Sequence, residues 1–401
     1  MSRTIVVIGA LDTKGNDFAF VKAAIEDAGH KALVIDVGVI GEPGLEPDIP
    51  ASRVAEAAGV SLQALRERAD RGEAIAAMTR GIAVVVEELF QSGSIDGIIG
   101  MGGSAGTIIG TAGMRALPVG VPKVQVSTLA GSDVGAYVGT KDVVMFPSIV
   151  DVAGVNRITS RIYANAVGAV IGMAETVLPE IADRPLIAAS MFGNTTKLVD
   201  RCREVFERKG YEVLVFHATG TGGKTMENLI YEGYFNGVLD LTTTEWADEL
   251  AGGVLSAGTE RLDAAATMGI PQVIAPGCLD MVNYWARETV PPEYDGRLFY
   301  EWTSNVTLMR TTPEENAALG RILADKANNS SAPTAIYLPL QGVSMLDSPG
   351  GEFWWPEADA ALFDAIKKHA RPEIPVYELD LNINDAAFAD AVSAKLLEYL
   401  S

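Results

Sequence analysis

The chain has 401 residues, and its 52 acidic and 31 basic side chains give it a formal net charge of −21. This charge repels nucleic-acid backbones and anionic membranes, so neither is expected as a partner. No apolar run approaches the roughly 20 residues of a membrane span. With two cysteines a disulfide framework is excluded, so we expect a cytoplasmic protein. The length and the 48% hydrophobic content predict a globular protein of two or three domains.

The chain opens with a strand–helix–strand pattern. Residues 3–10 form an apolar run typical of a strand rather than a signal peptide, helical spacing follows, and residues 31–37 predict a second strand. This unit implies a parallel sheet, whose ligands bind beyond the carboxyl ends of its strands. Asp12, Thr13 and Lys14 fall at such an end, where Lys14 suits an anion and Asp12 suits a metal ion or a ribose. A surface turn with a helix cap is the alternative.

The most distinctive stretch of the first half is a strand–glycine loop–helix junction at residues 97–117. Backbone N–H groups and the positive end of the helix dipole would face one point there, which is typical of phosphate binding. The expected contacts are Gly102, Gly103, Ser104, Gly106 and Thr107, with Thr128 at the end of the next predicted strand, 123–127. The glycine spacing matches neither the dinucleotide fingerprint nor the phosphate loop of ATPases. A tight turn that binds nothing is the alternative.

The second half repeats the plan of the first. The first half continues with predicted helices at 51–70, 73–91 and 149–178, a strand at 142–146 and a linker at 180–185. Five apolar runs then predict strands that each end in polar, glycine-rich residues: 186–191, 212–217, 237–241, 272–275 and 335–340. A strand at 376–381 and a helix at 385–400 close the chain. Parallel strands share one carboxyl edge, so these polar ends should converge on one cleft.

Residue types in this cleft suggest acid–base chemistry on an anion. The expected catalytic residues are His217, Lys224, Glu245 and Asp280, which supply proton transfer, metal binding and a cation. The expected substrate contacts are Thr195, Thr196, Gly222, Gly223, Thr243 and Arg310, with Arg261 and Arg297 as further anion clamps. Residues 218–225 also match a permissive phosphate loop with Asp240 placed for magnesium, and Cys278 could act as a nucleophile. A purely structural origin of these polar ends is the remaining alternative.

Seven stretches spread over nearly the whole chain carry a family resemblance: Gly9–Gly15, Gly102–Thr107, Phe216–Lys224, Leu239–Glu245, Ala275–Asn283, Val306–Thr312 and Gly342–Asp347. Together they resemble the Tm-1-like ATP-binding family, UPF0261. The resemblance implies an α/β fold of two Rossmann-like three-layer subdomains with mostly parallel sheets, residues 1–183 and 184–401. It further implies that the first subdomain holds ATP and Mg²⁺ and that the protein is a homodimer. A small residue is expected where Cys278 stands, which weakens a catalytic role for this thiol.

These features lead us to expect an ATP·Mg²⁺-binding protein that acts on a small anionic metabolite, a carboxylate or a sugar acid, by ATP-dependent transfer or ligation. The alternatives are a nucleotide-gated regulatory or binding protein without turnover, and an ATP-independent hydrolase or lyase working in the second domain. The second polar cleft favours an enzyme, because a sensor needs only one site. The apolar stretch 149–178 and the aromatic residues near Trp354 predict the homodimer contact. Some relatives carry an additional TIM-barrel domain, so a separate TIM-barrel partner protein is a further expectation.

Overall fold

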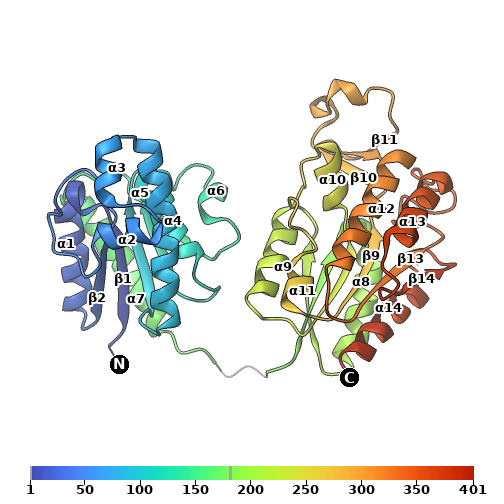
Figure 1. The fold of residues 1–401 in the computed structure, drawn as a ribbon, viewed down its shortest axis with the longest axis horizontal. Helices are drawn as coiled ribbons and strands as arrows, with labels where there is room; N and C mark the ends of the chain where they lie inside the picture. Colours follow the sequence, from blue (N-terminus) through green and yellow to red (C-terminus); the bar gives the residue numbers. More distant parts are fainter. Residues whose placement is uncertain (1, 180–182) are drawn as a thin grey trace. The chain divides into compact units, whose positions relative to one another are not determined.

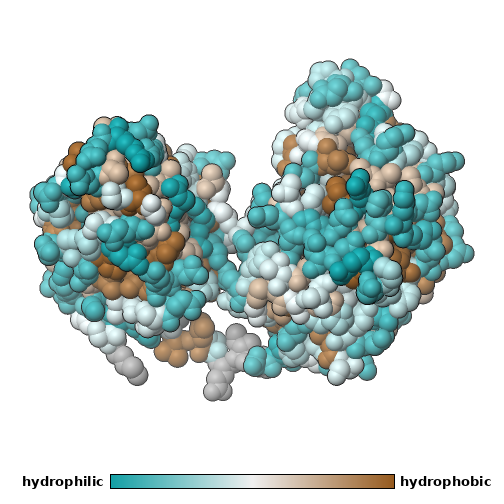
Figure 2. Space-filling view, viewed as in Figure 1, coloured by the Kyte–Doolittle hydropathy of each residue, from teal (hydrophilic) through white to brown (hydrophobic). Residues whose placement is uncertain are grey.

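The computed structural model describes residues 2–179 and 183–401, which belong to two compact units, Met1–Glu180 and Ile181–Ser401. Each unit is a parallel β-sheet with helices on both faces (Figure 1). The expected fold class, two Rossmann-like three-layer subdomains, is confirmed. Among the described residues no helix combines the length and the apolar character needed to cross a bilayer. The faces seen in Figure 2 are largely hydrophilic, in keeping with the charge of the chain.

The first unit is built on five parallel strands in the order β2-β1-β3-β4-β5 within residues 2–179. They are β1 (Thr4–Gly9), β2 (Lys31–Asp36), β3 (Gly97–Gly102), β4 (Lys123–Ser127) and β5 (Val144–Pro147). Side chains alternate between the faces, so Ile5 and Val7 of β1 lie in one core and Val6 and Ile8 in the other. Because both faces are covered, the central strands are apolar almost without interruption.

Helices cover both faces of this sheet: α1 (Leu11–Asp27), α2 (Ala51–Ala57), α3 (Leu62–Arg68), α4 (Arg71–Gln91), α5 (Ser104–Arg115), α6 (Gly135–Val138) and α7 (Thr159–Glu175). Residues of α2, α4 and α5 pack in the core that contains Val6, whereas α1 and α7 pack in the core that contains Ile5. The start of α4 is capped by Asp70, whose carboxylate accepts the N–H of Glu73 at 2.9 Å.

The second unit repeats this topology with one more strand. Its main sheet has the order β14-β13-β9-β8-β6-β7, and all five pairings are parallel. The strands are β6 (Leu186–Met191), β7 (Glu212–His217), β8 (Gly237–Thr242), β9 (Gln272–Gly277), β13 (Thr334–Pro339) and β14 (Val376–Leu379). In each of the two sheets the first strand of the unit lies next to an edge strand, with the second strand of the unit on one side and the remaining strands on the other.

Helices of the second unit also form two layers: α8 (Thr196–Glu207), α9 (Thr221–Tyr231), α10 (Glu245–Ala251), α11 (Ala264–Met268), α12 (Pro313–Asn328), α13 (Pro356–His369) and α14 (Ala386–Tyr399). The core on one face contains α8 and α14, and the cores on the other contain α9 to α13. A capping box starts α12, where Thr312 accepts the N–H of Glu315 at 3.2 Å and Glu315 accepts the N–H of Thr312 at 2.7 Å.

A small antiparallel sheet of order β10-β12-β11 was not predicted from the sequence. It consists of β10 (Met281–Tyr284), β11 (Phe299–Thr303) and β12 (Val306–Arg310). The segment that links β10 to β11 projects from the body of the unit (Figure 1) and contains the short 3-10 turns Arg287–Thr289 and Pro292–Tyr294. The strands have four or five residues each, too few for a period-2 pattern to stand out.

Two helices differ from their predicted extent. Helix α1 begins as early as Leu11, with a kink where Lys14 leaves helical geometry (φ −133°, ψ 22°). The expected helix 149–178 is α7 alone, Thr159–Glu175, and the residues before it are irregular. Apolar residues on either side of α7 extended this predicted helix beyond its true ends. Of the expected linker 180–185, residues 180–182 lie outside the described residues.

Candidate functional site

Both sheets contain a topological switch point, where consecutive crossovers leave a strand in opposite directions. In the first unit β1 lies between β2 and β3, and in the second unit β6 lies between β7 and β8. The chain therefore leaves the neighbouring strands β1 and β3 in one sheet, and β6 and β8 in the other, in diverging directions at the carboxyl edge. Open α/β sheets bind ligands in such a crevice. The candidate sites are the loops after β1 and β3 in one unit and after β6 and β8 in the other.

The β3–α5 junction combines close packing with open space. A Cβ placed on Gly102 would lie 2.9 Å from the Cα of Gly106, so these two glycines let strand and helix approach each other. Gly103 differs, because its added Cβ would meet only the Oγ1 of Thr128, at 3.8 Å. The side chains of Ser104 and Thr128 are exposed, and the first turn of α5 has no acidic residue. The junction thus leaves room for an anion at Gly103.

Thr107 does not take the role expected for it. Its side chain is fully buried, and its Oγ1 lies 2.7 Å from the Oγ of Ser127. At this place in α5 the side chain faces the sheet, where the hydroxyl pair joins the helix to the end of β4. The expectation that Thr107 donates its hydroxyl to a ligand is therefore corrected. Thr107 positions the junction instead.

The first turn of α1, which follows β1, lies next to this junction because β1 pairs with β3. The Oδ2 of Asp12 accepts the N–H of Ile40 at 2.9 Å and that of Gly41 at 3.2 Å, which ties the loop after β2 to α1. The ammonium of Lys14 donates to the backbone carbonyl of Val152. Thr13 is exposed. Asp12 and Lys14 thus hold neighbouring loops at the switch point, and Lys14 is not the free cation that the sequence suggested.

In the second unit a buried arginine, Arg261, gathers three carboxylates. Its Nε lies 2.6 Å from Glu245, its Nη1 3.0 Å from Glu227 and its Nη2 2.6 Å from Asp240. The pKa values of Glu245 and Glu227 are raised above their ordinary values because burial disfavours the charged carboxylates. The charge of Arg261 offsets only part of this rise. Arg261 and Glu245 are each 1% exposed. Glu245 is therefore an internal ion-pair partner rather than a solvent-facing catalytic base, and Arg261 cannot clamp a substrate.

The glycine loop at 218–225 is filled by the chain itself. The backbone N–H groups of Gly220 and Gly223 donate to the Oε1 of Glu245 at 2.7 and 3.1 Å. A Cβ on Gly223 would lie 2.2 Å from this carboxylate. Asp240, the aspartate considered for magnesium, is held by the arginine described above. The structure argues against the phosphate-loop alternative, because an internal carboxylate takes the N–H groups that a phosphate would need.

A second buried arginine, Arg310, forms a separate cluster. Its Nη2 lies 2.8 Å from Asp359 and 3.4 Å from Asp347, and the hydroxyl of Ser344 donates to the nearby Asp280 at 2.8 Å. Burial, reinforced by the charge of Asp347, raises the pKa of Asp280 to about 7 and that of Asp359 to about 8. Asp280 and Arg310 are 0% and 1% exposed. Neither is placed for direct contact with a substrate, which corrects both expectations.

Several expected contact residues are also internal. The Oγ1 of Thr195 lies 2.8 Å from that of Thr242, and the hydroxyl of Thr243 donates to a backbone carbonyl of β9 at 3.3 Å. Both side chains are fully buried. Gly222 lies against β7, since its added Cβ would be 1.8 Å from the carbonyl oxygen of His217. These residues shape the edge of the sheet, and their hydroxyls do not reach a ligand.

His217 and Lys224 are exposed, and Thr196 is half-buried with its hydroxyl on the carbonyl of Gly193 at 3.2 Å. The strand ends thus share one edge, yet the four expected catalytic groups do not share one cavity. Two are buried in different arginine clusters and two lie at the surface. The sequence placed all of them correctly at strand ends but could not tell inward from outward side chains.

The cysteine and the remaining arginine of the sequence analysis are also accounted for. Cys278 is fully buried with φ +59°, and burial raises the pKa of its thiol well above its usual range. A nucleophilic role would require an accessible thiolate. Arg297 pairs with Glu315 at 2.7 Å and donates to a backbone carbonyl of β12. Neither residue is free to contact a substrate.

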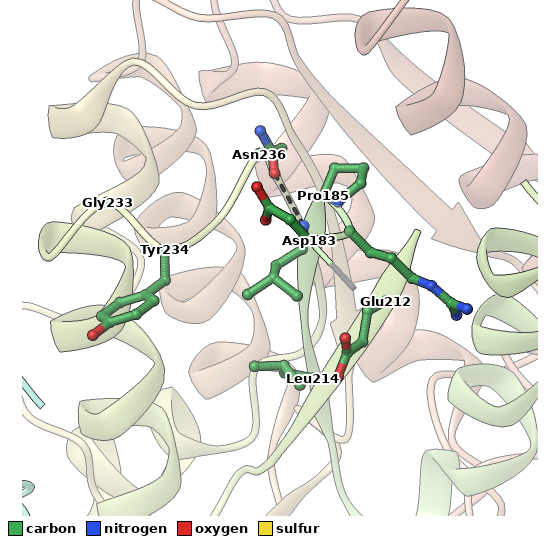
Figure 3. A pocket seen from close by; sticks show the side chains of 9 residues that line it. Asp183, Pro185, Glu212, Leu214, Gly233, Tyr234 and Asn236 are labelled. Atoms are coloured by element: carbon green, nitrogen blue, oxygen red, sulfur yellow. Dashed lines mark hydrogen bonds between the residues drawn. The ribbon is translucent and has the colours of Figure 1, made fainter. Parts of the chain in front are cut away.

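A hollow of about 790 Å³ lies at the opposite, amino-terminal edge of the second sheet (Figure 3). It is lined by Asp183, Arg184, Pro185, Leu186, Glu212, Leu214, Gly233, Tyr234 and Asn236. Among these described residues none was expected in a site. The amino-terminal edge is also not the edge at which open α/β sheets bind their ligands.

The fold and its switch points define the class: a two-unit, doubly wound α/β protein with a glycine-rich strand–helix junction at its first switch point. The chain belongs to the uncharacterised protein family UPF0261. Residues 3–179 match the model of the N-terminal domain of this family, and residues 184–400 match the model of its C-terminal domain. The resemblance found from seven sequence stretches is thereby confirmed.

Relatives extend from bacteria to a plant. A UPF0261 protein of Clostridium tetani is 49% identical over 100% of both chains, and one of Rhizobium meliloti is 46% identical over 98% of both. The ToMV resistance protein Tm-1(GCR237) of Solanum lycopersicum is 40% identical over 82% of this chain and 45% of its own length. A UDP-N-acetylglucosamine 2-epimerase structure from Rickettsia bellii aligns with 100% of this chain and 96% of its own at 10% identity, but the TM-score of 0.24 supports no functional comparison.

Proposed function

We propose that this protein binds ATP·Mg²⁺ at the switch point of the first unit and uses it for transfer to, or ligation of, a small anionic metabolite held by the second unit. The observation that carries the proposal is the β3–α5 junction. It places open space over Gly103 at the start of a 12-residue helix, between the loops of a switch point. The resemblance to an ATP-binding family supports the choice of nucleotide.

The junction has the chemistry that a triphosphate needs. The N–H of Thr107 donates to the carbonyl of Gly103 at 2.8 Å, so the N–H groups that precede it form the open end of the helix. These groups and the helix dipole attract an anion, and the exposed hydroxyls of Ser104 and Thr128 add donors. In a chain of net charge −21 an anion site requires such local compensation.

The residues also fit a magnesium ion that arrives with the nucleotide. Among the described residues, no three or more His, Cys, Asp or Glu side chains are grouped to hold a metal by themselves. Nucleotide-bound magnesium commonly uses one or two carboxylates, with phosphate oxygens and waters completing its shell. We propose Asp12, in the first turn of α1 directly after β1, for this role. Magnesium would neutralise phosphate charge and polarise the phosphoryl group.

In the second unit His217 and Lys224 are the expected catalytic residues whose side chains reach solvent. An imidazole can exchange a proton with a substrate hydroxyl or carboxyl group, and an ammonium can hold the anionic group. Glu245 and Asp280 serve as positioning residues. Glu245 fixes the loop between His217 and Lys224 through the N–H groups of Gly220 and Gly223.

A nucleotide-gated binding protein without turnover is the second candidate. The observation that favours it is the burial of both expected catalytic carboxylates, Glu245 and Asp280, in ion-pair or hydrogen-bond clusters. Assays of ADP and phosphate release with candidate carboxylates and sugar acids separate the two functions. Release that depends on the metabolite supports the enzyme, whereas tight ATP binding without release supports the gated binder.

The nucleotide site is tested by isothermal titration calorimetry with ATP·Mg²⁺. Gly103 has extended backbone (φ −78°, ψ −155°), so Gly103→Val folds without strain while its methyl groups fill the space at the junction. We expect ATP affinity to fall at least several-fold. Gly168→Val is the matched control, because a Cβ at this exposed position of α7 meets no atom within 4 Å. Equal ATP affinity in both variants would refute the site.

We further propose that the protein is a cytoplasmic homodimer. Ile149, Val155 and Ile158 are 70%, 42% and 47% exposed in the segment before α7, and apolar side chains gathered in this way are typical of interfaces. Light scattering that shows a monomer at micromolar concentration would count against the dimer. A separate TIM-barrel protein is proposed as a further partner, because the tomato relative is about twice as long as its matched part. Co-purification from the native organism tests this partner.

A further inference from the structure

An exposed tryptophan lies over the switch point of the second unit. Trp302, on β11, is 41% exposed, and its Cζ2 would be 3.9 Å from a Cβ placed on Gly193. Gly193 is itself exposed and opens the turn between β6 and α8. The small antiparallel sheet, which the proposed function leaves unused, thus brings an indole ring to the loop where this topology binds ligands.

Further rings continue from this point on both sides. The ring of Phe192, next to Gly193, lies 5.4 Å from the exposed imidazole of His217. On the other side the ring of Tyr300 lies 6.2 Å from Trp302. Phe192 and Tyr300 both pack against one buried apolar cluster, which fixes their places. We call Phe192, His217, Tyr300 and Trp302 the aromatic shelf.

Two cationic side chains follow residues of the aromatic shelf closely along the chain. Lys197 and Lys224 are exposed in the first turns of α8 and α9, and neither of these turns has an acidic residue. Cations and flat apolar faces therefore lie at the strand ends that form this switch point.

We propose that the aromatic shelf binds the ring of a carbohydrate anion, so that the metabolite of the second unit is a cyclic sugar acid or sugar phosphate. This deepens the proposed function and rests on its anion site in the second unit. The C–H bonds of a sugar ring carry partial positive charge and are attracted to the negative face of an indole. The carboxylate or phosphate is held by Lys197 and Lys224.

The test compares ring and open-chain ligands by calorimetry. Glucuronate is matched with gluconate, and glucose 6-phosphate with sorbitol 6-phosphate, because each pair shares its anionic group and its six carbons. The Gly103→Val protein is the background, so that the first unit does not contribute phosphate binding. At least one ring ligand should bind about tenfold or more tightly than its open-chain match, a factor at the scale of single-ring stacking on an aromatic side chain.

Variants then locate the ring. Trp302→Ala should remove this preference and leave the open-chain ligand unchanged, and Trp302→Leu, which keeps apolar bulk, should do the same. Trp285→Ala is the matched control, since Trp285 is another exposed tryptophan (53%) just past the end of β10. Lys224→Ala should weaken ring and open-chain ligands alike. Trp302→Phe should restore most of the preference.

Each outcome separates the two proposals. Ring and open-chain ligands that bind equally, with Lys224→Ala weakening both, would overturn the ring inference and leave the anion site intact. No binding of any of the four ligands would overturn both. Equal losses in Trp302→Ala and Trp285→Ala would show that the preference does not depend on stacking against Trp302, and the ring inference would fail. Conversion of a dimer to a monomer by Trp302→Ala would show that a second copy of the chain covers the shelf, and the ring inference would fail.

Discussion

Replacement of Arg261 by methionine should destabilise the second unit strongly. Arg261 is 1% exposed and compensates Glu227, Asp240 and Glu245, which are all buried. Removing one partner of a buried ion pair costs about 3–5 kcal/mol, because an uncompensated charge remains. With a urea m-value of about 2.5 kcal/mol/M, this cost lowers the unfolding midpoint by about 1–2 M.

Tryptophan fluorescence measures this effect in the correct unit, because all five tryptophans lie between residues 246 and 355. Arg201→Met is the matched control, since Arg201 pairs with Asp390 on the surface and should change the midpoint little. The loss in Arg261→Met should be smallest near pH 5 and grow towards pH 8. Without the arginine, the buried carboxyl groups bind protons more tightly in the folded state than in the unfolded state. The free energy of unfolding therefore falls as the pH rises. A midpoint that shifts no more than in Arg201→Met would refute this reasoning.

Two further predictions concern the second unit. Burial raises the pKa of Asp280 from 3.8 to about 7 and that of Asp359 from 3.8 to about 8, so stability should fall as pH rises from about 4 to about 8 and level off above that range. A urea midpoint by tryptophan fluorescence that rises between these pH values would contradict the assignment. Gly223→Ala should lower the midpoint, by about 1 M or less for a cost of about 1–3 kcal/mol, because its Cβ would lie 2.2 Å from the Glu245 carboxylate. An unchanged midpoint in Gly223→Ala would show that the carboxylate moves freely.

The sequence by itself determined the α/β class and the position of polar residues at strand ends. Buried parallel strands are apolar over their whole length, and glycine-rich turns mark their ends, so β3 and the junction at Gly102–Thr107 could be predicted from local pattern. Local sequence patterns do not reveal the order of the strands in a sheet. Only the structure shows that β1 lies beside β3 and β6 beside β8, which makes these loops switch points.

Tertiary structure alone decided which polar side chains face inward. Glu245 and Lys224 both follow strands closely in sequence, yet Glu245 is drawn inside by Arg261, sixteen residues further on, while Lys224 stays in solvent. Such pairing depends on contacts between elements that are distant along the chain, and no spacing rule encodes it. Trp302 was passed over for the same reason. Its strand is short, and its contact with the turn at Gly193 joins residues more than a hundred positions apart, so only packing of the folded chain brings this ring to the site.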